Sequence, residues 1–384
     1  MKILQIVPTI GPGTGVAAVA HHLEQEWRAA GVDVGQFTLD DAHGGWLPEP
    51  GPGVLGKLTL LARVVWFSTV GSVLARRRLA EEPGTVGVCH NDALAGDVYV
   101  NHGILRVAMA SRGGYVWRML RNPLHLFTAL RDMWRYQHGT HRAVVNLTAE
   151  ESRALAAVYP RMTTRAVVIG NGIDVERYRP PSAEERSAAR RSLGLGPDDV
   201  ALVFIGHEYD RKGLPLVLDA LTLLPPQVRL VVVGGSTDMV AALDQRVRAL
   251  GVGERVRAVG RRADPRPILH AADALVTPSA YESYGLVVLE ALACGVPVIA
   301  TPVGCVPDVV DDGGCGYVVE PTPAAIARAV HRLRDADRAS LALAARATAE
   351  RNSWGDVARS YLDLVTTMAA ARAGDARPAP RRAR

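Results

Sequence analysis

The sequence predicts an α/β protein with two domains, each a doubly wound parallel sheet covered by helices. Short apolar runs alternate with helical segments, which is the pattern of parallel strands connected by helices. The pattern starts again once, beyond the polar, proline-containing stretch that follows Asp174. The chain has 384 residues, more than a single hydrophobic core usually organises. These observations predict one domain over residues 1–174 and another over 175–352.

Twelve apolar runs are predicted strands. In the first half they are Ile3–Val7, Val34–Leu39, Val86–Cys89, Val98–Val100, Ala143–Leu147 and Ala166–Ile169. In the second half they are Ala201–Ile205, Arg229–Val233, Arg255–Val259, Ala274–Thr277, Val298–Ala300 and Tyr317–Val319. Open parallel sheets bind ligands at the carboxyl ends of their strands, so two such domains would face each other across a cleft.

The composition is that of a soluble globular protein, with 48% hydrophobic and 22% charged residues. No stretch of about 20 uncharged apolar residues occurs, so we expect no membrane-spanning helix. The first residues predict a buried strand rather than a signal peptide, because Pro8 ends a short apolar run. A cytoplasmic location is therefore expected. The net charge is +5, and the tail 372–384 is basic, rich in Pro and Ala, and expected to be disordered.

The cysteines predict no metal site. They show neither a Cys-x-x-Cys pair nor histidines at zinc spacing, so we expect buried, reduced thiols. The four are Cys89, Cys294, Cys305 and Cys315.

Two carboxylates eight positions apart, Glu282 and Glu290, are the strongest functional signal. Glu282 lies in the loop after a predicted strand, and Glu290 lies about two turns into the helix that follows. Between them, the amides near Tyr284, Gly285 and Leu286 form a helix N-terminus, which favours an anion. The stretch combines a candidate phosphate-binding site with two carboxylates that can accept hydrogen bonds from hydroxyls. A sugar nucleotide requires both.

This segment, with its Pro-Ser, Tyr-Gly-Leu and Ala-Cys-Gly-Val-Pro-Val context, resembles the E-x7-E signature of retaining GT-B glycosyltransferases of the family-four, or group 1, clan. The resemblance implies two Rossmann-like domains, the first for the acceptor and the second for the nucleotide sugar. It implies that Glu282 contacts the transferred sugar and that Glu290 accepts hydrogen bonds from the ribose. It also implies that a helix over 353–371 crosses back to the first domain, and that neither a metal nor a cofactor is required.

A second motif, from Gly206 to Gly213, resembles the family's Gly-x5-Lys-Gly loop, whose cation meets the donor diphosphate. Arg211 can fork onto two phosphate oxygens, and Lys212 acts as a point charge. Many family members have Arg directly after the first Gly, where this chain has His207. Others use adjacent Arg and Lys, as here. The resemblance therefore places Arg211 and Lys212 beside the leaving diphosphate.

The first domain offers candidates for the facing wall. A glycine-rich turn after the first strand contains Gly13 and Gly15, where the backbone can approach a ligand closely. Relatives have a histidine at the position of His102, close to the donor sugar and the acceptor. His90 also follows a strand, but we weight it well below His102 because a histidine at a strand end is more often structural.

Residues 106–142 contain seven Arg and one acidic residue, Asp132, with aromatic residues between them. The aromatic residues are Tyr115, Trp117, Phe127, Trp134 and Tyr136. Upstream, the mostly apolar segment 58–75 ends in three consecutive Arg. Such a mixture suits an anionic membrane surface, although an ordinary helix whose aromatics pack into the core is equally consistent with it. No nucleic-acid-binding module accompanies the charge, so nucleic acid is not an expected partner.

The function expected from these residues is transfer of a hexosyl-type sugar from a UDP- or GDP-linked donor to a hydroxyl, possibly of a lipid-linked or cell-envelope glycan. Two alternatives remain. One is a sugar-nucleotide 2-epimerase, which has the same architecture, and the other is an inactive membrane-docked scaffold. A nicotinamide dehydrogenase is weaker still because a proper dinucleotide fingerprint is absent.

Overall fold

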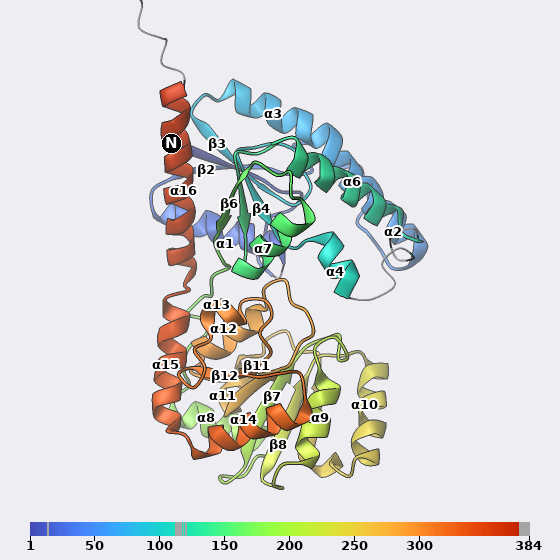
Figure 1. The fold of residues 1–384 in the computed structure, drawn as a ribbon, viewed down its shortest axis with the longest axis vertical. Helices are drawn as coiled ribbons and strands as arrows, with labels where there is room; N and C mark the ends of the chain where they lie inside the picture. Colours follow the sequence, from blue (N-terminus) through green and yellow to red (C-terminus); the bar gives the residue numbers. More distant parts are fainter. Residues whose placement is uncertain (14, 112–116, 118, 120, 376–384) are drawn as a thin grey trace, which may run out of the picture. The chain divides into compact units, whose positions relative to one another are not determined.

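The computed structural model describes all residues except 14, 112–116, 118, 120 and 376–384. The chain divides into two compact units (Figure 1). The first contains Met1–Asn171 together with the chain from Trp354 onward, and the second contains Gly172–Ser353. The expected division after residue 174 and before residue 353 lies close to these limits.

The first unit is a six-stranded parallel sheet in the order β2-β1-β3-β4-β5-β6. Its strands are β1 (Lys2–Ile6), β2 (Asp33–Phe37), β3 (Thr85–His90), β4 (Val98–Asn101), β5 (Ala143–Asn146) and β6 (Arg165–Val168). Its helices are α1 (Val16–Ala29), α2 (Gly53–Trp66), η1 (Phe67–Gly71), α3 (Ser72–Glu81), α4 (Leu105–Ser111), α6 (Pro123–Gln137), α7 (Ala149–Val158) and α16 (Trp354–Asp375). The strand order reverses between β1 and β3.

The C-terminal helix α16 belongs to the first unit because it packs on α1. The indole Nε1 of Trp27 donates to the carbonyl of Ala358 at 3.0 Å, and the rings of Trp27 and Tyr361 meet edge to face. At the start of α16, Trp354 stacks on His22 with ring centroids 4.9 Å apart. Buried aromatic contacts of this kind hold α16 against the sheet's helical layer.

The second unit is also a six-stranded parallel sheet, in the order β12-β11-β10-β7-β8-β9. Its strands are β7 (Val200–Ile205), β8 (Val228–Val233), β9 (Val256–Gly260), β10 (Ala274–Thr277), β11 (Val298–Ala300) and β12 (Gly316–Val318). Its helices are α8 (Ala183–Ser192), α9 (Leu214–Thr222), α10 (Thr237–Ala249), η2 (Gly253–Arg255), α11 (Arg266–Ala271), α12 (Leu286–Ala293), α13 (Val306–Val309), α14 (Pro323–Asp335) and α15 (Arg338–Glu350).

The predicted fold class is confirmed, since every predicted strand is present in one of two parallel sheets. The strands read clearly in the sequence because helices cover both faces of each sheet. Strands β3, β4 and β5 are consequently buried at every position. In the second unit the strand order, read from β9 to β12, is 3-2-1-4-5-6, the order of the dinucleotide-binding fold. Its reversal lies between β7 and β10.

One helical run has the length and composition of a membrane-spanning helix, although the sequence predicts none. A helical run in the described residues, Gly53–Glu81, is long and apolar enough to cross a membrane, and only 28% of its most apolar window is buried. It comprises α2, η1 and α3 (Figure 1). The sequence criterion of about 20 uncharged residues excludes it because Arg63 interrupts the apolar run.

The basic, aromatic region 106–142 divides between core and surface. Arg131 and Arg135 are buried and paired with Asp132 at 3.1 and 2.9 Å, and Arg131 also meets Asp92 at 2.7 Å. Tyr136 is buried as well. The interpretation of these two arginines as part of a basic surface is therefore wrong, because they neutralise buried carboxylates instead. The same region exposes the rings of Trp117 and Trp134.

The prediction that the tail 372–384 is disordered is wrong for residues 372–375, which continue helix α16 to Asp375. The rest of the tail, 376–384, lies outside the described residues. All four cysteines are buried and none forms a disulfide.

Glu151 provides a test of the packing in the first unit. Its Oε2 accepts from the amide of Leu147 at 2.9 Å, while Oε1 is buried without a partner. Burial raises the pKa of Glu151 to about 7, with the Leu147 amide acting in the opposite direction. When folding raises the pKa of a carboxyl, the free energy of unfolding of the protein falls as the pH rises from the unfolded-state pKa to the folded-state pKa.

We expect Glu151→Gln to raise the free energy of unfolding at about pH 8 by about 3 kcal/mol, because burial then penalises the wild-type carboxylate only in the folded state. The gain shrinks as the pH falls from about 7 toward 4.5, the ordinary pKa of a glutamate side chain. Urea unfolding followed by tryptophan fluorescence reports on this unit, which holds all six tryptophans. Exposed Glu150→Gln is the control, and an effect independent of pH would contradict the prediction.

Candidate functional site

The candidate site of the second unit lies at the point where its strand order reverses. The loop after β7 (206–213) and the loop after β10 (278–285) leave the carboxyl ends of neighbouring strands. Neighbouring strands that feed helices on opposite faces leave a crevice between their loops, and ligands bind there. The predicted phosphate loop and the loop that carries the first glutamate are thus brought together.

An ion pair joins the two loops. Lys212 Nζ lies 2.7 Å from Glu282 Oε1, and Arg211 Nη1 lies 3.6 Å from the same oxygen. The side chains of Lys212 and Glu282 are only 15% and 14% exposed. Arg211 is further held by Glu208, whose Oε2 lies 2.8 Å from Nε, and by the carbonyl of Tyr281. Two cations, Lys212 and Arg211, are therefore held at the crevice by two carboxylates, Glu282 and Glu208.

Backbone contacts press the two loops together. Gly213 has φ 78°, and a Cβ at this position would lie 2.2 Å from the carbonyl oxygen of Pro278. Two residues before Gly213 and two after Pro278, the amide of Ala280 donates to the carbonyl of Arg211 at 2.9 Å. Only glycine fits a left-handed position so close to another backbone. The loops hold Lys212 and Glu282 in register through these contacts.

Glu282 is held on its own side by hydroxyls. Ser279 Oγ donates to Glu282 Oε1 at 2.9 Å, and Thr301 Oγ1 donates to the carbonyl of Ser279 at 2.6 Å. Gly304 packs beneath, where a Cβ would meet the carbonyl of Tyr284 at 2.4 Å and Glu282 Cβ at 2.8 Å. The carboxylate is thus positioned by the loops after β10 and β11 before any ligand arrives.

The predicted helix is confirmed, since α12 spans Leu286–Ala293 and Gly285 precedes it at φ 88°. Tyr284 is buried, and its carbonyl accepts from the amide of Cys305 at 2.7 Å. The contribution of Tyr284 to the site therefore comes from its backbone. Gly285 carries no side chain over the helix N-terminus, and no side chain caps it. The first amides of α12 are consequently left facing the loop that holds Glu282.

Glu290 lies on α12, where burial raises its pKa. The phenol of Tyr178 is hydrogen-bonded to it, and Arg177 and Lys212 are close enough to act in the opposite direction on that pKa. Arg346 holds the backbone that carries Tyr178, donating to the carbonyls of Tyr178 and Val175 at 2.8 and 3.0 Å. Glu290 is thus a desolvated acceptor that already receives a hydrogen bond from one hydroxyl.

In the first unit the candidates gather at the carboxyl ends of adjacent strands. Gly13 and Gly15 both have positive φ, 135° and 76°, and a Cβ on either would meet no atom within 4 Å. Gly15 begins α1. His102, one residue after β4, is half-buried and contacts His90, with His90 Nδ1 3.1 Å from His102 Nε2. The glycine turn therefore leaves open space beside the start of a helix.

Sequence reasoning missed several residues of these sites. Ser279 belongs to the Pro-Ser motif, three residues before Glu282, and this short separation could have predicted their contact. Tyr178 was taken only as part of a polar boundary, and nothing in its neighbourhood signals that it reaches Glu290. Gly304 was visible in a loop that received no role, because its packing under Glu282 depends on the fold.

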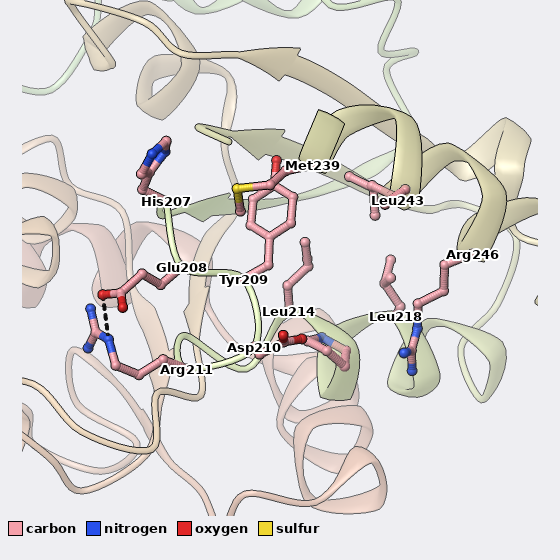
Figure 2. A pocket seen from close by; sticks show the side chains of 12 residues that line it. His207, Glu208, Tyr209, Asp210, Arg211, Leu214, Leu218, Met239, Leu243 and Arg246 are labelled. Carbon is pink, nitrogen blue, oxygen red and sulfur yellow. Dashed lines mark hydrogen bonds and ion pairs between the residues drawn. The ribbon is translucent and has the colours of Figure 1, made fainter. Parts of the chain in front are cut away.

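A separate cavity of about 560 Å³ lies between the 207–211 loop and helices α9 and α10. Figure 2 shows its apolar side chains, which include Leu214, Leu218 and Leu243, and shows Arg211 turned toward Glu208. Neither Lys212 nor the two predicted glutamates line it. Among the residues that the structure describes, no group of three or more His, Cys, Asp or Glu is placed to hold a metal ion.

Comparison with known proteins finds a family match for the second unit. Residues 185–350 match the family model described as "Glycosyl transferases group 1". The D-inositol 3-phosphate glycosyltransferase of Xylanimonas cellulosilytica is 37% identical over 234 residues, which make up 58% of this chain and 56% of that protein. The chain thus spans about half the length of this curated relative.

Solved structures resemble the whole chain. WaaG, a glycosyltransferase involved in lipopolysaccharide biosynthesis, superposes with a TM-score of 0.72 at 20% identity, covering 95% of this chain and 99% of WaaG. HepE of Anabaena, in complex with UDP-glucose, has a TM-score of 0.65 at 23% identity, covering 96% of this chain and all of HepE. At such identities the likeness concerns the fold.

Two glycines test how tightly the loops are joined. We expect Gly285→Ala to cost about 1 kcal/mol, the penalty of a left-handed backbone alone. Gly213→Ala adds a clash with the Pro278 carbonyl, so we expect it to cost about 3 kcal/mol. Differential scanning calorimetry of both variants measures the difference. Equal costs would mean that the two loops do not press on each other at Gly213.

Proposed function

We propose that the protein transfers a hexosyl-type sugar from a nucleoside-diphosphate sugar to a hydroxyl acceptor, with retention. The match of residues 185–350 to the group 1 glycosyltransferase model and the GT-B fold of the chain support this proposal. The observation that carries this proposal is the Lys212–Glu282 pair at the reversal point of the second sheet. It places a cation for a phosphate beside a carboxylate for sugar hydroxyls. A nucleotide sugar presents those two groups next to each other.

In the proposed reaction the bond between the anomeric carbon and the phosphate oxygen breaks, and its electron pair leaves with the diphosphate. Lys212 and Arg211 stabilise that charge, so no metal ion is needed for this purpose. The acceptor oxygen bonds to the anomeric carbon on the same face, and its proton passes to the departing phosphate oxygen. Glu282 orients the sugar hydroxyls.

The nucleoside end of the donor is assigned to Glu290. A hydrogen bond from a hydroxyl stabilises a buried carboxylate more than an exposed one. The raised pKa of Glu290 reflects such burial. The phenol of Tyr178 is hydrogen-bonded to this carboxyl. A ribose hydroxyl would add to this hydrogen bond or replace it. Gly13 and Gly15 offer backbone to the donor or acceptor without steric hindrance.

The donor is proposed to be UDP- or GDP-linked. HepE, which shares the fold, binds UDP-glucose. The acceptor is proposed to be a hydroxyl of a lipid-linked or cell-envelope glycan. Because the chain is similar to a D-inositol 3-phosphate glycosyltransferase, a phosphorylated cyclitol is a further candidate acceptor. Among the alternatives, a 2-epimerase would convert the free nucleotide sugar without an acceptor, and an inactive scaffold would bind no donor.

Location at the inner face of an anionic membrane is part of the proposal. Helices α2 and α6 contact each other, and both expose large apolar side chains. Those on α2 include Val54, Leu55 and Leu58, at 74%, 76% and 54% exposure. Those on α6 include Leu130 and Trp134, at 62% and 54% exposure. An exposed apolar surface of this kind, with the exposed arginines of α3 nearby in sequence, suits a peripheral membrane contact.

The donor site is tested by Lys212→Met and Glu282→Gln. We expect Lys212→Met to weaken donor binding on the order of tenfold or more, because it removes a charge-assisted contact to phosphate. Glu282→Gln should lower turnover on the order of 100-fold while leaving nucleotide binding largely intact. UDP-, GDP- and ADP-sugars are compared by thermal protection, followed by release of nucleoside diphosphate. Exposed Arg191→Met is the control. Folded variants with normal turnover would refute the assignment.

The membrane contact is tested by sedimentation with lipid vesicles. We expect the protein to bind vesicles that contain phosphatidylglycerol and to bind phosphatidylcholine vesicles weakly. The double variant Leu130→Asp with Trp134→Ala should lose this binding, because both side chains are exposed on α6. Leu343→Asp is the matched control, since Leu343 is 73% exposed on the other unit. Binding that survives the double variant would place the contact elsewhere.

A further inference from the structure

Three side chains form a hydrogen-bonded chain where the strand order of the first sheet reverses. Gln5 is on β1, His90 ends β3, and His102 follows β4, and these strands are neighbours. His90 Nε2 lies 3.1 Å from Gln5 Oε1, and His90 Nδ1 lies 3.1 Å from His102 Nε2. The two imidazole rings lie 26° from parallel. One end of the chain is buried, and the other is His102.

The direction of hydrogen bonding follows from the buried end. The amide nitrogen of Gln5 donates to the carbonyl of Ala20 at 2.8 Å, and a carbonyl can only accept. Gln5 therefore presents its oxygen to His90, so His90 must carry its proton on Nε2. His90 Nδ1 is then a lone pair, which can only accept. His102 must in turn donate from Nε2, and its own Nδ1 is left without a proton.

Burial excludes the charged, doubly protonated forms of His90 and His102. Gln5 and His90 have no exposed surface. Burial lowers the pKa of His90 well below its usual value, with the neighbouring His102 acting in the same direction. It also lowers the pKa of His102 to about 4. Both rings are therefore neutral near pH 7, each with a single ring proton, and the hydrogen-bonded chain has one consistent direction.

We propose that His90 is a positioning residue that holds His102 in the tautomer protonated on Nε2, so that His102 Nδ1 accepts a hydrogen bond from a hydroxyl of the sugar donor or the acceptor. This inference rests on the proposed function, because it gives His102 a substrate. Within the described part of the chain, Nδ1 of His102 receives no hydrogen bond. Gln5 anchors the arrangement through β1.

The tautomer selects the chemistry that His102 recognises. A neutral imidazole with a lone pair at Nδ1 attracts a group that carries a proton, which a hydroxyl does. It repels the oxygens of a phosphate or carboxylate, which are acceptors only. The opposite tautomer would favour the anion. His90 therefore directs His102 to the hydroxyl part of the substrate and away from the diphosphate.

The experiment reads the tautomer directly, by long-range proton–nitrogen correlation spectra of the full-length protein labelled with ¹⁵N-histidine. The signals of His102 are identified by their loss in His102→Asn. We expect His102 Nε2 to show the shift of a protonated nitrogen and Nδ1 that of an unprotonated one. His90→Leu should mix the two forms. His90→Asn, whose Oδ1 sits where Nδ1 did, should restore the wild-type form.

Turnover gives a second readout with UDP-glucose as the probe. We expect His90→Leu to lower kcat for UDP release on the order of tenfold with a nearly unchanged KM, and His90→Asn to recover much of the loss. His141→Gln is the matched control, because His141 is also buried in this unit but contacts the carbonyl of Gly96. It should change neither readout.

The two readouts separate the inference from the proposed function. A wild-type spectrum with His102 protonated on Nδ1, or one unchanged in His90→Leu, overturns the role of His90 whatever the turnover. Should His90→Leu misfold, the wild-type spectrum and that of Gln5→Leu decide the matter, since the latter removes the anchor. Absence of turnover with every nucleotide sugar contradicts the glycosyltransferase proposal and leaves the tautomer assignment standing.

Discussion

The contact between the loops after β7 and β10 is the constraint on which the donor side of this protein depends. Parallel strands at a point of reversal send their helices to opposite faces, so their loops separate unless something holds them. Here Gly213 allows the first loop to lie against the carbonyl of Pro278, and Lys212 reaches Glu282 across the gap. The cation and the carboxylate are therefore positioned by backbone packing, and the ion pair adds to an arrangement that already exists.

A partly buried ion pair is weak evidence for stability, since desolvation offsets much of the attraction. Its value at this site is different. Glu282 holds Lys212, and Glu208 holds Arg211, so both cations already lie at the crevice. The two carboxylates keep these long cationic side chains in place. A ligand phosphate would find them already oriented, with less conformational entropy to lose.

The reversal points of the two sheets use opposite electrostatics. The second unit gathers charge around Glu282, whereas the first gathers neutral groups, Gln5, His90 and His102, whose protons are directed by hydrogen bonds. Burial explains the difference, because imidazoles without a nearby carboxylate lose their charge when they are desolvated. Charge suits the phosphates of a nucleotide sugar, and a neutral acceptor suits its hydroxyls.

The sequence alone determined the two sheets, all twelve strands and helix α12, because parallel strands buried on both faces read as apolar runs and Gly285 marks the start of the helix. It also pointed to the two glutamates and the Arg-Lys pair. Only the tertiary structure decided that Lys212 touches Glu282, that Tyr178 reaches Glu290, and that Arg131 is buried. These contacts join segments distant in the chain. Strand order sets them, and no local pattern of residues records strand order.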